Sequence, residues 1–330
     1  FILHMKEKII TKKILKWYDL NKRPLPWRKK VSVEKKQYYT LISEFMLQQT
    51  QVITVIPFFN RFIKNLPSIN SLAKVSEKKL IKLWEGLGYY SRARNLKKSA
   101  QVILKNFDGK LPDNFEDLIT LPGIGNYTAN AILAIAFNKP YIPLDGNIER
   151  VLKRYLYLKK DKEIQKDYLL QKKIVFGKTL RSSDYAQALM ELGALICKPN
   201  NPICAQCPII KNCKSYKKKD FSLIKNIKKN KDKYFVLKVY KKNQRYLLIK
   251  NKKFNFLKNL TIFPMEELSN PKNFNENLNF KMSNMNMNIK IEYSNDNKKF
   301  PYSYWVDGTK MNSYMLPSFT KKIVQYLEKN

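Results

Sequence analysis

Apolar positions recur at helical spacing through the first two thirds of the chain. Those between Leu41 and Ile56 fall near a period of about 3.6 residues, which predicts an amphipathic helix. Further helices are expected over 128–137 and directly after Asp145. From about residue 7 to residue 213, the pattern therefore predicts helices joined by short turns.

The last third of the chain has a different pattern. Residues 234–240 and 246–249 are typical of two strands, a further strand is expected over 302–306, and a final helix over 317–327. The Asn-rich stretch 270–288 is predicted to be a loop. The sequence thus predicts two domains, an all-α domain followed by a small α+β domain.

The charge balance indicates a polyanionic partner. The 330 residues include 64 Lys and Arg against 26 Asp and Glu, a formal net charge of +38. An AT-rich genome would also enrich Lys, but it does not require so few acidic residues, so nucleic acid is the favoured partner. Lys and Asn dominate 214–233 as well, which is expected to be a linker or a solvated surface helix.

Nothing in the sequence has the length of a membrane span. The longest apolar run, Ala131 to Phe137, is far shorter than the roughly 20 residues that cross a bilayer. Residues 1–6 lack the apolar core of a signal peptide, so we expect a cytoplasmic, nucleoid-associated bacterial protein without membrane contact. The only histidine, His4, lies outside any expected core, which excludes histidine triads and histidine metal ligands.

All four cysteines lie in one short segment, as Cys197, Cys204, Cys207 and Cys213. Four thiolates at this spacing can bind one metal centre, either zinc or an iron–sulfur cluster, and ligand number alone favours zinc. Disulfides are the poorer interpretation, because no secretion signal accompanies the cysteines.

Two carboxylates are candidates for acid–base chemistry. Glu44 lies among apolar and amide residues, where desolvation would raise its pKa and suit it to act as a general acid. Asp145 directly precedes an expected helix, so its carboxylate, held ionised by helix amides, could face a developing cation. Each also has an ordinary structural interpretation, as a surface or helix-terminal carboxylate and as a helix N-cap.

Two further segments suit DNA binding. Residues 121–129 read LPGIGNYTA, in which Gly123 and Gly125 allow a tight turn that brings free amides to a helix start, an arrangement that binds phosphate. Residues 84–96 interleave aromatic side chains with arginines, which can stack on bases and pair with phosphates.

Together these motifs resemble the adenine DNA glycosylases of the MutY type, in the helix-hairpin-helix superfamily. The matching segments are 25–28, 43–52, 84–96, 121–129, 145–150 and 192–194, which leads into the cysteines. The 6-2-5 spacing of the cysteines resembles the loop that carries a [4Fe–4S] cluster in this superfamily, which favours the cluster over zinc. The resemblance implies a monomeric base excision repair enzyme that removes adenine mispaired with 8-oxoguanine or guanine in double-stranded DNA.

The resemblance also implies roles for individual residues. Glu44 would protonate N7 of the flipped adenine and then assist the attacking water, while Asp145 would stabilise the oxocarbenium sugar. Tyr127 and Asn147 would support that pair. Expected around the substrate are Arg23, Trp27, Leu47, Gln48, Tyr89 and Gln187; expected at DNA phosphates are Gly123, Gly125, Arg92 and Arg94.

Tyr127 separates two branches of the superfamily. The endonuclease III type has a lysine at this position, which attacks C1′ and cleaves the strand through a Schiff base. A phenol cannot form a Schiff base, so the sequence predicts a monofunctional glycosylase that leaves an abasic site. The alternatives are a bifunctional glycosylase and lyase, or a DNA-binding relative without catalysis.

The resemblance divides the chain into a glycosylase domain over 5–215, with the cluster loop at 197–213, a Lys-rich linker over 216–232, and a Nudix-like domain over 233–330. In the family this last domain reads 8-oxoguanine through a Phe-Ser-His motif.

The matching stretch here is 302–304, where Ser303 is retained and tyrosines flank it. Residues 262–264 read Ile-Phe-Pro where the family has Trp-Glu-Phe-Pro. The sequence has no Nudix box of clustered glutamates, so nucleotide hydrolysis is not expected.

Overall fold

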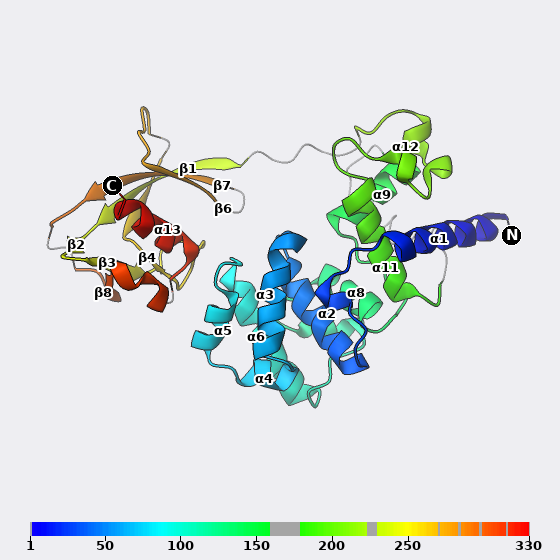
Figure 1. The fold of residues 1–330 in the computed structure, drawn as a ribbon, viewed down its shortest axis with the longest axis horizontal. Coiled ribbons are helices and arrows are strands. Elements are labelled where there is room, and N and C mark those ends of the chain that lie inside the picture. Colours follow the sequence, from blue (N-terminus) through cyan, green and yellow to red (C-terminus); the bar gives the residue numbers. More distant parts are fainter. Residues whose placement is uncertain are drawn as a thin grey trace. The chain divides into compact units, whose positions relative to one another are not determined.

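The computed structural model describes residues 2–158, 179–222, 230–269, 271–282, 285–296, 299–314 and 316–329. They form two compact units, one from 1–75 and 91–225 and the other from 76–90 and 226–330 (Figure 1). Part of the predicted linker, residues 223–229, lies outside the described residues.

The first unit is helical, as the sequence predicts. Its longer helices are α1 (Ile2–Asn21), α2 (Val33–Leu47), α3 (Val52–Asn65), α6 (Tyr90–Asn106), α8 (Asn126–Ile135), α9 (Gly146–Leu156) and α11 (Ser182–Glu191). Shorter elements are η1 (Pro26–Arg28), α4 (Ile69–Lys74), α7 (Phe115–Thr120), η3 (Leu192–Ile196), η4 (Cys204–Gln206), η5 (Ile210–Asn212) and α12 (Lys214–Lys217). Helix α5 (Glu77–Trp84) belongs to the second unit.

Side-chain caps fix where several of these helices begin. Ser32, Asn114 and Asp145 each accept a hydrogen bond from a backbone amide in the first turn of α2, α7 and α9. Apolar faces of α1, α9 and α11 then pack together, with Ile14 and Leu189 fully buried. This core sets the positions of the helix starts that surround the site described below.

The helix predicted over 41–56 is interrupted in the structure. Helix α2 ends at Leu47, Gln49 adopts a left-handed φ of 55°, and α3 begins at Val52. The apolar period continues across this turn because α2 and α3 pack on each other, so periodicity alone could not reveal the break.

The second unit contains two sheets and a helix. The larger sheet has the order β5 (Met265–Leu268), β1 (Lys231–Val239), β7 (Met285–Tyr293), β6 (Leu278–Met282), with β1 and β7 parallel. In the smaller sheet, β3 (Arg245–Lys250) pairs with β2 (Lys241–Lys242), β4 (Thr261–Ile262) and β8 (Ser303–Asp307). η6 (Gly308–Ser313) and α13 (Ser318–Leu327) follow, so the predicted α+β class is confirmed.

The prediction of a loop over 270–288 is wrong. Strand β6 and the start of β7 lie within it, and Met285, Met287 and Ile289 alternate into the core. The intervening asparagines concealed this period of two residues, because Asn is depleted in strands and common in loops.

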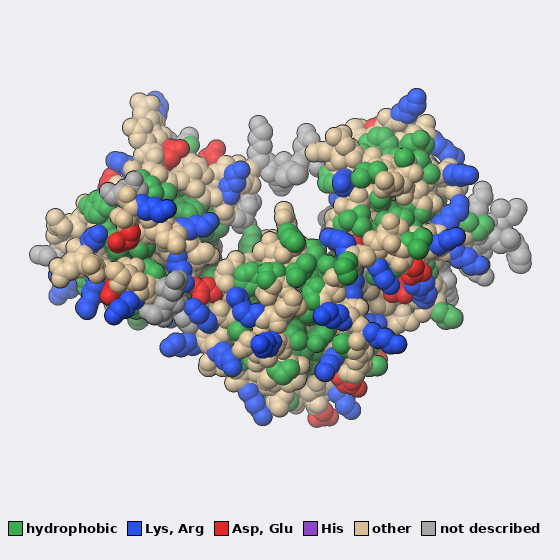
Figure 2. Space-filling view, in the orientation of Figure 1, with side chains coloured by type: hydrophobic (Ala, Val, Ile, Leu, Met, Phe, Trp, Pro, Cys, Tyr) green, Lys and Arg blue, Asp and Glu red, His purple; other side chains and the backbone are tan. Residues whose placement is uncertain are grey.

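Basic side chains outnumber acidic ones on the visible surface of the protein (Figure 2). On the face shown in Figure 2, Lys and Arg side chains are spread over both units, and Asp and Glu are sparse. Among the described residues, no helix combines the length and apolar character needed to cross a membrane.

Two glycines in the turn between α7 and α8 provide a test of how this turn packs against α2 and α6. Gly123 has φ 83°, and a Cβ there would lie 2.9 Å from atoms of both Phe45 and Asn95, whereas a Cβ at Gly125 would meet nothing within 4 Å. We expect Gly123→Ala to lower the free energy of unfolding by about 2 kcal/mol or more, from a left-handed backbone and overpacking. Gly125→Ala is the matched control, and urea denaturation giving equal losses for both variants would contradict the packing described.

Candidate active site

A cavity of about 760 Å³ opens in the helical unit. The end of α2, the turn into α3, the starts of α8 and α9, and α11 contribute to its lining. It brings together most of the residues predicted for the reaction and the substrate: Arg23, Trp27, Glu44, Leu47, Gln48, Tyr127, Asp145, Asn147 and Gln187.

Glu44 is the carboxyl group most altered by this environment. It lies on α2 and is 5% exposed, and its Oε2 atom has no hydrogen-bond partner among the described residues. Burial raises the pKa of Glu44 to about 7; a hydrogen bond with Tyr127 opposes this rise, the negative charge of Asp145 adds to it, and the positive charge of Arg28 opposes it. The carboxyl is therefore partly protonated near neutral pH, as a general acid requires.

Asp145 caps α9 as the sequence predicts. Its Oδ1 accepts a hydrogen bond from the amide of Ile148 at 2.7 Å, and its Oδ2 accepts one from Nδ2 of Asn147 at 2.8 Å. Burial nevertheless raises the pKa of Asp145 above its ordinary value, because desolvation outweighs these hydrogen bonds. The N-cap geometry is thus confirmed, and the pKa of Asp145 shifts in the direction opposite to the one that the helix amides alone would give.

Tyr127 lies one residue inside α8 and hydrogen-bonds to Glu44. Burial, together with the negative charges of Glu44 and Asp145, holds the pKa of Tyr127 well above its ordinary value. The side chain therefore remains a neutral phenol, which donates its proton toward the Glu44 carboxyl.

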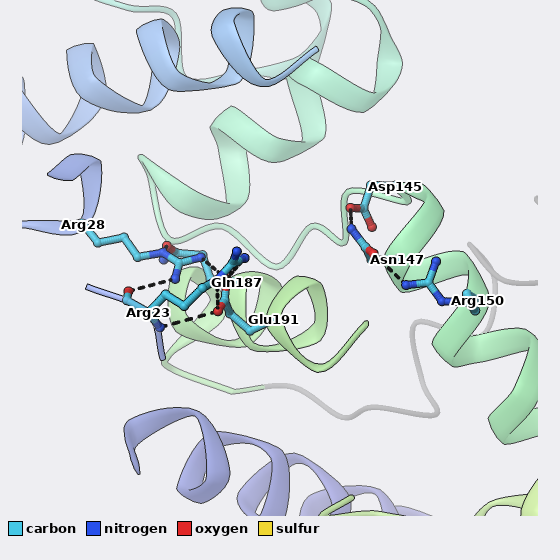
Figure 3. A network of polar contacts seen from close by, with 7 residues as sticks. All are labelled: Arg23, Arg28, Asp145, Asn147, Arg150, Gln187 and Glu191. Atoms are coloured by element: carbon cyan, nitrogen blue, oxygen red, sulfur yellow. Dashed lines mark hydrogen bonds and ion pairs between the residues drawn. The ribbon is translucent and has the colours of Figure 1, made fainter. Parts of the chain in front are cut away.

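Asn147 is held between Asp145 and Arg150 (Figure 3). Arg150 Nη2 donates to Asn147 Oδ1 at 2.7 Å and to the Gly193 carbonyl at 2.7 Å, and its Nε donates to the Cys197 carbonyl at 2.6 Å. A Cβ at Gly193 would lie 2.6 Å from Cβ of Asn147, so only glycine allows α9 and η3 to approach this closely. Arg150 was not among the predicted site residues, although it lies in a matching motif.

A second network joins two predicted residues, Arg23 and Gln187, to two that the sequence analysis missed, Arg28 and Glu191 (Figure 3). Arg23 donates to both Glu191 oxygens, at 2.8 and 2.7 Å, while Arg28 donates to Glu191 at 3.1 Å and to Gln187 at 2.8 Å. Burial alone would raise the pKa of Glu191, but the arginines reverse this effect and lower it. The available signal was the spacing of Gln187 and Glu191, which places both on one face of α11.

The turn after α2 separates two neighbouring glutamines. Gln48 points inward, where its Nε2 contacts the Gly123 carbonyl and Thr128 Oγ1, both at 3.4 Å. Gln49, which was not predicted, is exposed and also lines the cavity. Gln49 is thus the more accessible of the two for contact with a bound molecule.

One of the four residues predicted to bind phosphate, Arg92, is buried. Gly123 and Gly125 lie in the turn between α7 and α8, and Gly125 is the N-cap residue of α8, which therefore has no side-chain cap. Arg92 is 7% exposed and donates to backbone carbonyls of α2. Its guanidinium is therefore not available for the predicted contact with DNA phosphate. Arg94, on the same helix, is partly exposed.

The cysteine loop packs beside α9. Each of the four cysteines is a free, partly exposed thiol. Arg154, a buried residue of α9, donates to the carbonyls of Lys198 and Pro199 at 2.6 and 2.7 Å, and its Nη1 lies 3.5 Å from Cys197 Sγ. No group of three or more His, Cys, Asp or Glu side chains within the described part of the chain is arranged to hold a metal ion.

Two predicted substrate residues lie in the second unit. Ser303 begins β8, and its hydroxyl donates to the Phe300 carbonyl at 2.9 Å, beside Tyr302, which is 71% exposed and has φ 58°. Tyr89 also has a left-handed φ, of 46°, and is 39% exposed. The residues at 262 and 263 are buried in the core rather than presented at the surface.

Several known proteins with similar sequences are adenine DNA glycosylases. Residues 42–174 match the HhH-GPD superfamily of base excision DNA repair proteins. The chain is 42% identical over 260 residues to an adenine DNA glycosylase of Buchnera aphidicola subsp. Baizongia pistaciae, with 76% of this chain and 72% of that protein covered. It is 39% identical over 211 residues to the human adenine DNA glycosylase, with 61% of this chain and 38% of that protein covered.

Solved structures resemble the helical unit. A thermostable thymine-DNA glycosylase matches with a TM-score of 0.58 and 27% identity, covering 65% of this chain and 98% of that one. A trapped endonuclease III–DNA covalent intermediate matches with a TM-score of 0.52 and 21% identity, covering 64% and 98%, which supports a shared fold.

The pKa of Glu44 makes stability depend on pH. The folded protein keeps this proton up to about pH 7, whereas the unfolded chain releases it near the ordinary value of 4.5. The stability from protonated Glu44 is therefore fully present below pH 4.5 and is lost as pH rises through 7, by roughly 3 kcal/mol.

We expect Glu44→Gln, which cannot ionise, to avoid this loss, so that its stability relative to wild type increases by that amount between pH 4 and pH 8. Glu34→Gln is the control, because Glu34 lies exposed at the start of the same helix and its pKa is lowered by hydrogen bonds from its backbone and from Ser32. Parallel urea-denaturation profiles for Glu44→Gln and wild type across this range would show that Glu44 is not desolvated.

Proposed function

The chain belongs to the adenine DNA glycosylases, base excision repair enzymes of the HhH-GPD superfamily that act on DNA, and we propose that it removes adenine opposite 8-oxoguanine or guanine without cutting the strand. The observation that carries this proposal is that one cavity is lined by two carboxyl groups, the buried Glu44 and the half-buried Asp145. Hydrolysis adds water across the N-glycosidic bond and yields free adenine and an abasic sugar.

Glu44 is proposed as the general acid. A flipped adenine in the cavity would receive the Glu44 proton at N7, and loss of electron density from the base would weaken the bond to C1′. A pKa of about 7 keeps a useful fraction of the proton in place at neutral pH. The resulting carboxylate then accepts a proton from the attacking water.

Asp145 is proposed to stabilise the sugar cation. Its carboxylate is oriented by the Ile148 amide and by Asn147, so it does not need to reorganise as positive charge develops. At about 4 Å and an effective dielectric of 20, opposite unit charges attract by roughly 4 kcal/mol. A contact of this size, formed only in the transition state, would accelerate the reaction by up to about a thousandfold.

The polar wall of Arg23, Arg28, Gln187 and Glu191 is proposed to recognise the base. Glu191 and Gln187 offer acceptors, and the arginines hold both in place, so an adenine edge could pair with groups that are already oriented. Trp27 packs edge-on against Phe59 and supplies an apolar surface to the cavity. Leu47 adds to that surface, and we assign the contact predicted for Gln48 to the exposed Gln49 instead.

Phosphate contacts are proposed for the amides that follow Gly123 and Gly125, at the uncapped start of α8, and for Arg94. The second unit is proposed to be Nudix-like and to read 8-oxoguanine, supported by its mixed sheet and the exposed residues around Ser303. Tyr89, exposed on a left-handed turn, is proposed as a further base contact.

We propose that Cys197, Cys204, Cys207 and Cys213 ligate a [4Fe–4S] cluster. Four free thiols on one loop suit this donor set, and three of them pack against the core beside α9. A bound cluster would crosslink the loop at four points. Arg150 and Arg154 already fix its first turn through backbone carbonyls.

Chemical analysis tests the cluster. Protein purified without oxygen is expected to contain about four iron atoms and as many labile sulfides per chain. One zinc per chain, with no iron, would overturn this assignment.

Strand chemistry tests the main proposal. A duplex with an A:8-oxoguanine pair is expected to show strand breaks only after alkali, and borohydride should trap no adduct, because the phenol of Tyr127 forms no Schiff base. Direct breaks with trapping would indicate a lyase, and binding without excision a DNA-binding relative. Glu44→Gln should bind the duplex but excise at least about 100-fold more slowly, whereas Glu34→Gln should match wild type.

The same assay tests the second unit. Ser303→Ala is expected to lower the preference for A:8-oxoguanine over A:G while leaving excision from A:G intact, because Ser303 does not line the cavity that contains the proposed acid. An unchanged preference would refute a role for Ser303.

A further inference from the structure

Arg92 occupies an unusual position for a residue of a DNA-binding protein. It lies in the first turn of α6, is 7% exposed, and directs its guanidinium into the protein. Nη1 donates to the carbonyls of Phe45 and Met46, at 3.2 and 2.9 Å, and to the carbonyl of Gln48 by a short contact.

These acceptors belong to the C-terminus of α2. The last carbonyls of a helix lack partners within the helix, and their aligned dipoles favour a cation. Here one buried arginine satisfies three of them with charge-assisted hydrogen bonds, which are stronger than neutral ones. The helix that carries Glu44 is therefore fixed at its end by a residue from α6.

Arg92 also spans the turn that follows. Its Nη2 donates to Thr50 Oγ1 at 3.1 Å, so its contacts lie on both sides of Gln49. Gln49 has φ 55°, a left-handed conformation that is unfavourable for a residue with a side chain and persists only where neighbours hold it. Gln49 is also the exposed member of the cavity wall contributed by this turn.

We propose that Arg92 is a positioning residue for adenine excision: it locks the turn of residues 48–50, and with it the end of the Glu44 helix, in the conformation that receives the flipped nucleotide. It touches neither base nor phosphate. This inference rests on the proposed function of the cavity, in which Glu44 is the acid. A purely structural arginine would support overall stability and leave the turn and the reaction rate of the folded protein unchanged.

Hydrogen exchange of the DNA-free protein tests the turn directly. Arg92→Met is expected to speed exchange in peptides that cover 45–52, with no change in peptides from α9 or α11. Lys105→Met, in the exposed last turn of α6, is the matched loss of a positive charge and should leave exchange unchanged. Because no DNA is present, this result is independent of whether adenine excision is the reaction.

Single-turnover excision from the A:8-oxoguanine duplex then tests the consequence. Arg92→Met is expected to excise about 100-fold more slowly, since small displacements of a site cost this much. The excision rate of Arg92→Lys should fall between those of wild type and Arg92→Met, because one ammonium cannot bridge Gln48 and Thr50 in the same way. Guanidinium added to Arg92→Gly should restore much of the rate, and urea at the same concentration should not.

Folded Arg92→Met protein with wild-type exchange over 45–52, or with an excision rate within about twofold of wild type, would overturn the proposal. If Arg92→Met fails to fold, Arg92→Lys decides by the same two measurements. Failure of Glu44→Gln to slow excision would reject the proposed acid alone, since the exchange pattern reports on Arg92 without reference to Glu44.

Discussion

The desolvation of Glu44 beside a second carboxyl is the constraint on which the site depends. Two acids in one cavity repel each other when both are ionised, and burial removes the water that would screen them. Here the two carboxyl groups respond differently to burial. One oxygen of Glu44 has no partner within the described parts of the chain, and its pKa is raised to about 7, whereas Asp145 accepts hydrogen bonds from a helix amide and from Asn147. Two carboxyl groups in one cavity thereby have different hydrogen-bonding environments.

Close approach of backbones makes this arrangement possible. Gly123 lets the hairpin contact Phe45, the residue after Glu44, and Gly193 lets η3 contact Asn147, the residue that supports Asp145. A glycine therefore allows close packing against α2, which carries Glu44, and another against α9, which Asp145 caps. Arginines complete the structure, with Arg92 at the end of α2 and Arg150 joining α9 to the cysteine loop.

Positive charge has two separate uses in this chain. The net charge of +38 favours a general attraction for DNA, which requires no particular geometry. Arg23, Arg28, Arg92, Arg150 and Arg154 are instead turned inward, where they orient carboxylates and carbonyls. Guanidinium suits this second use, because its fixed fork can satisfy several acceptors at once.

Local sequence signals were sufficient for the helical class, for the N-cap at Asp145, for the strands around 234–249, and for the family to which the chain belongs. They identified Glu44 and Tyr127 because these residues stand in short contiguous motifs. The break after Leu47, the strands within 270–288 and the inward direction of Arg92 depended on packing between segments distant in sequence. The sequence did not predict Glu191 and Arg28 as site residues for the same reason. They are 163 positions apart in sequence, and only folding brings the guanidinium of Arg28 to the buried carboxylate of Glu191.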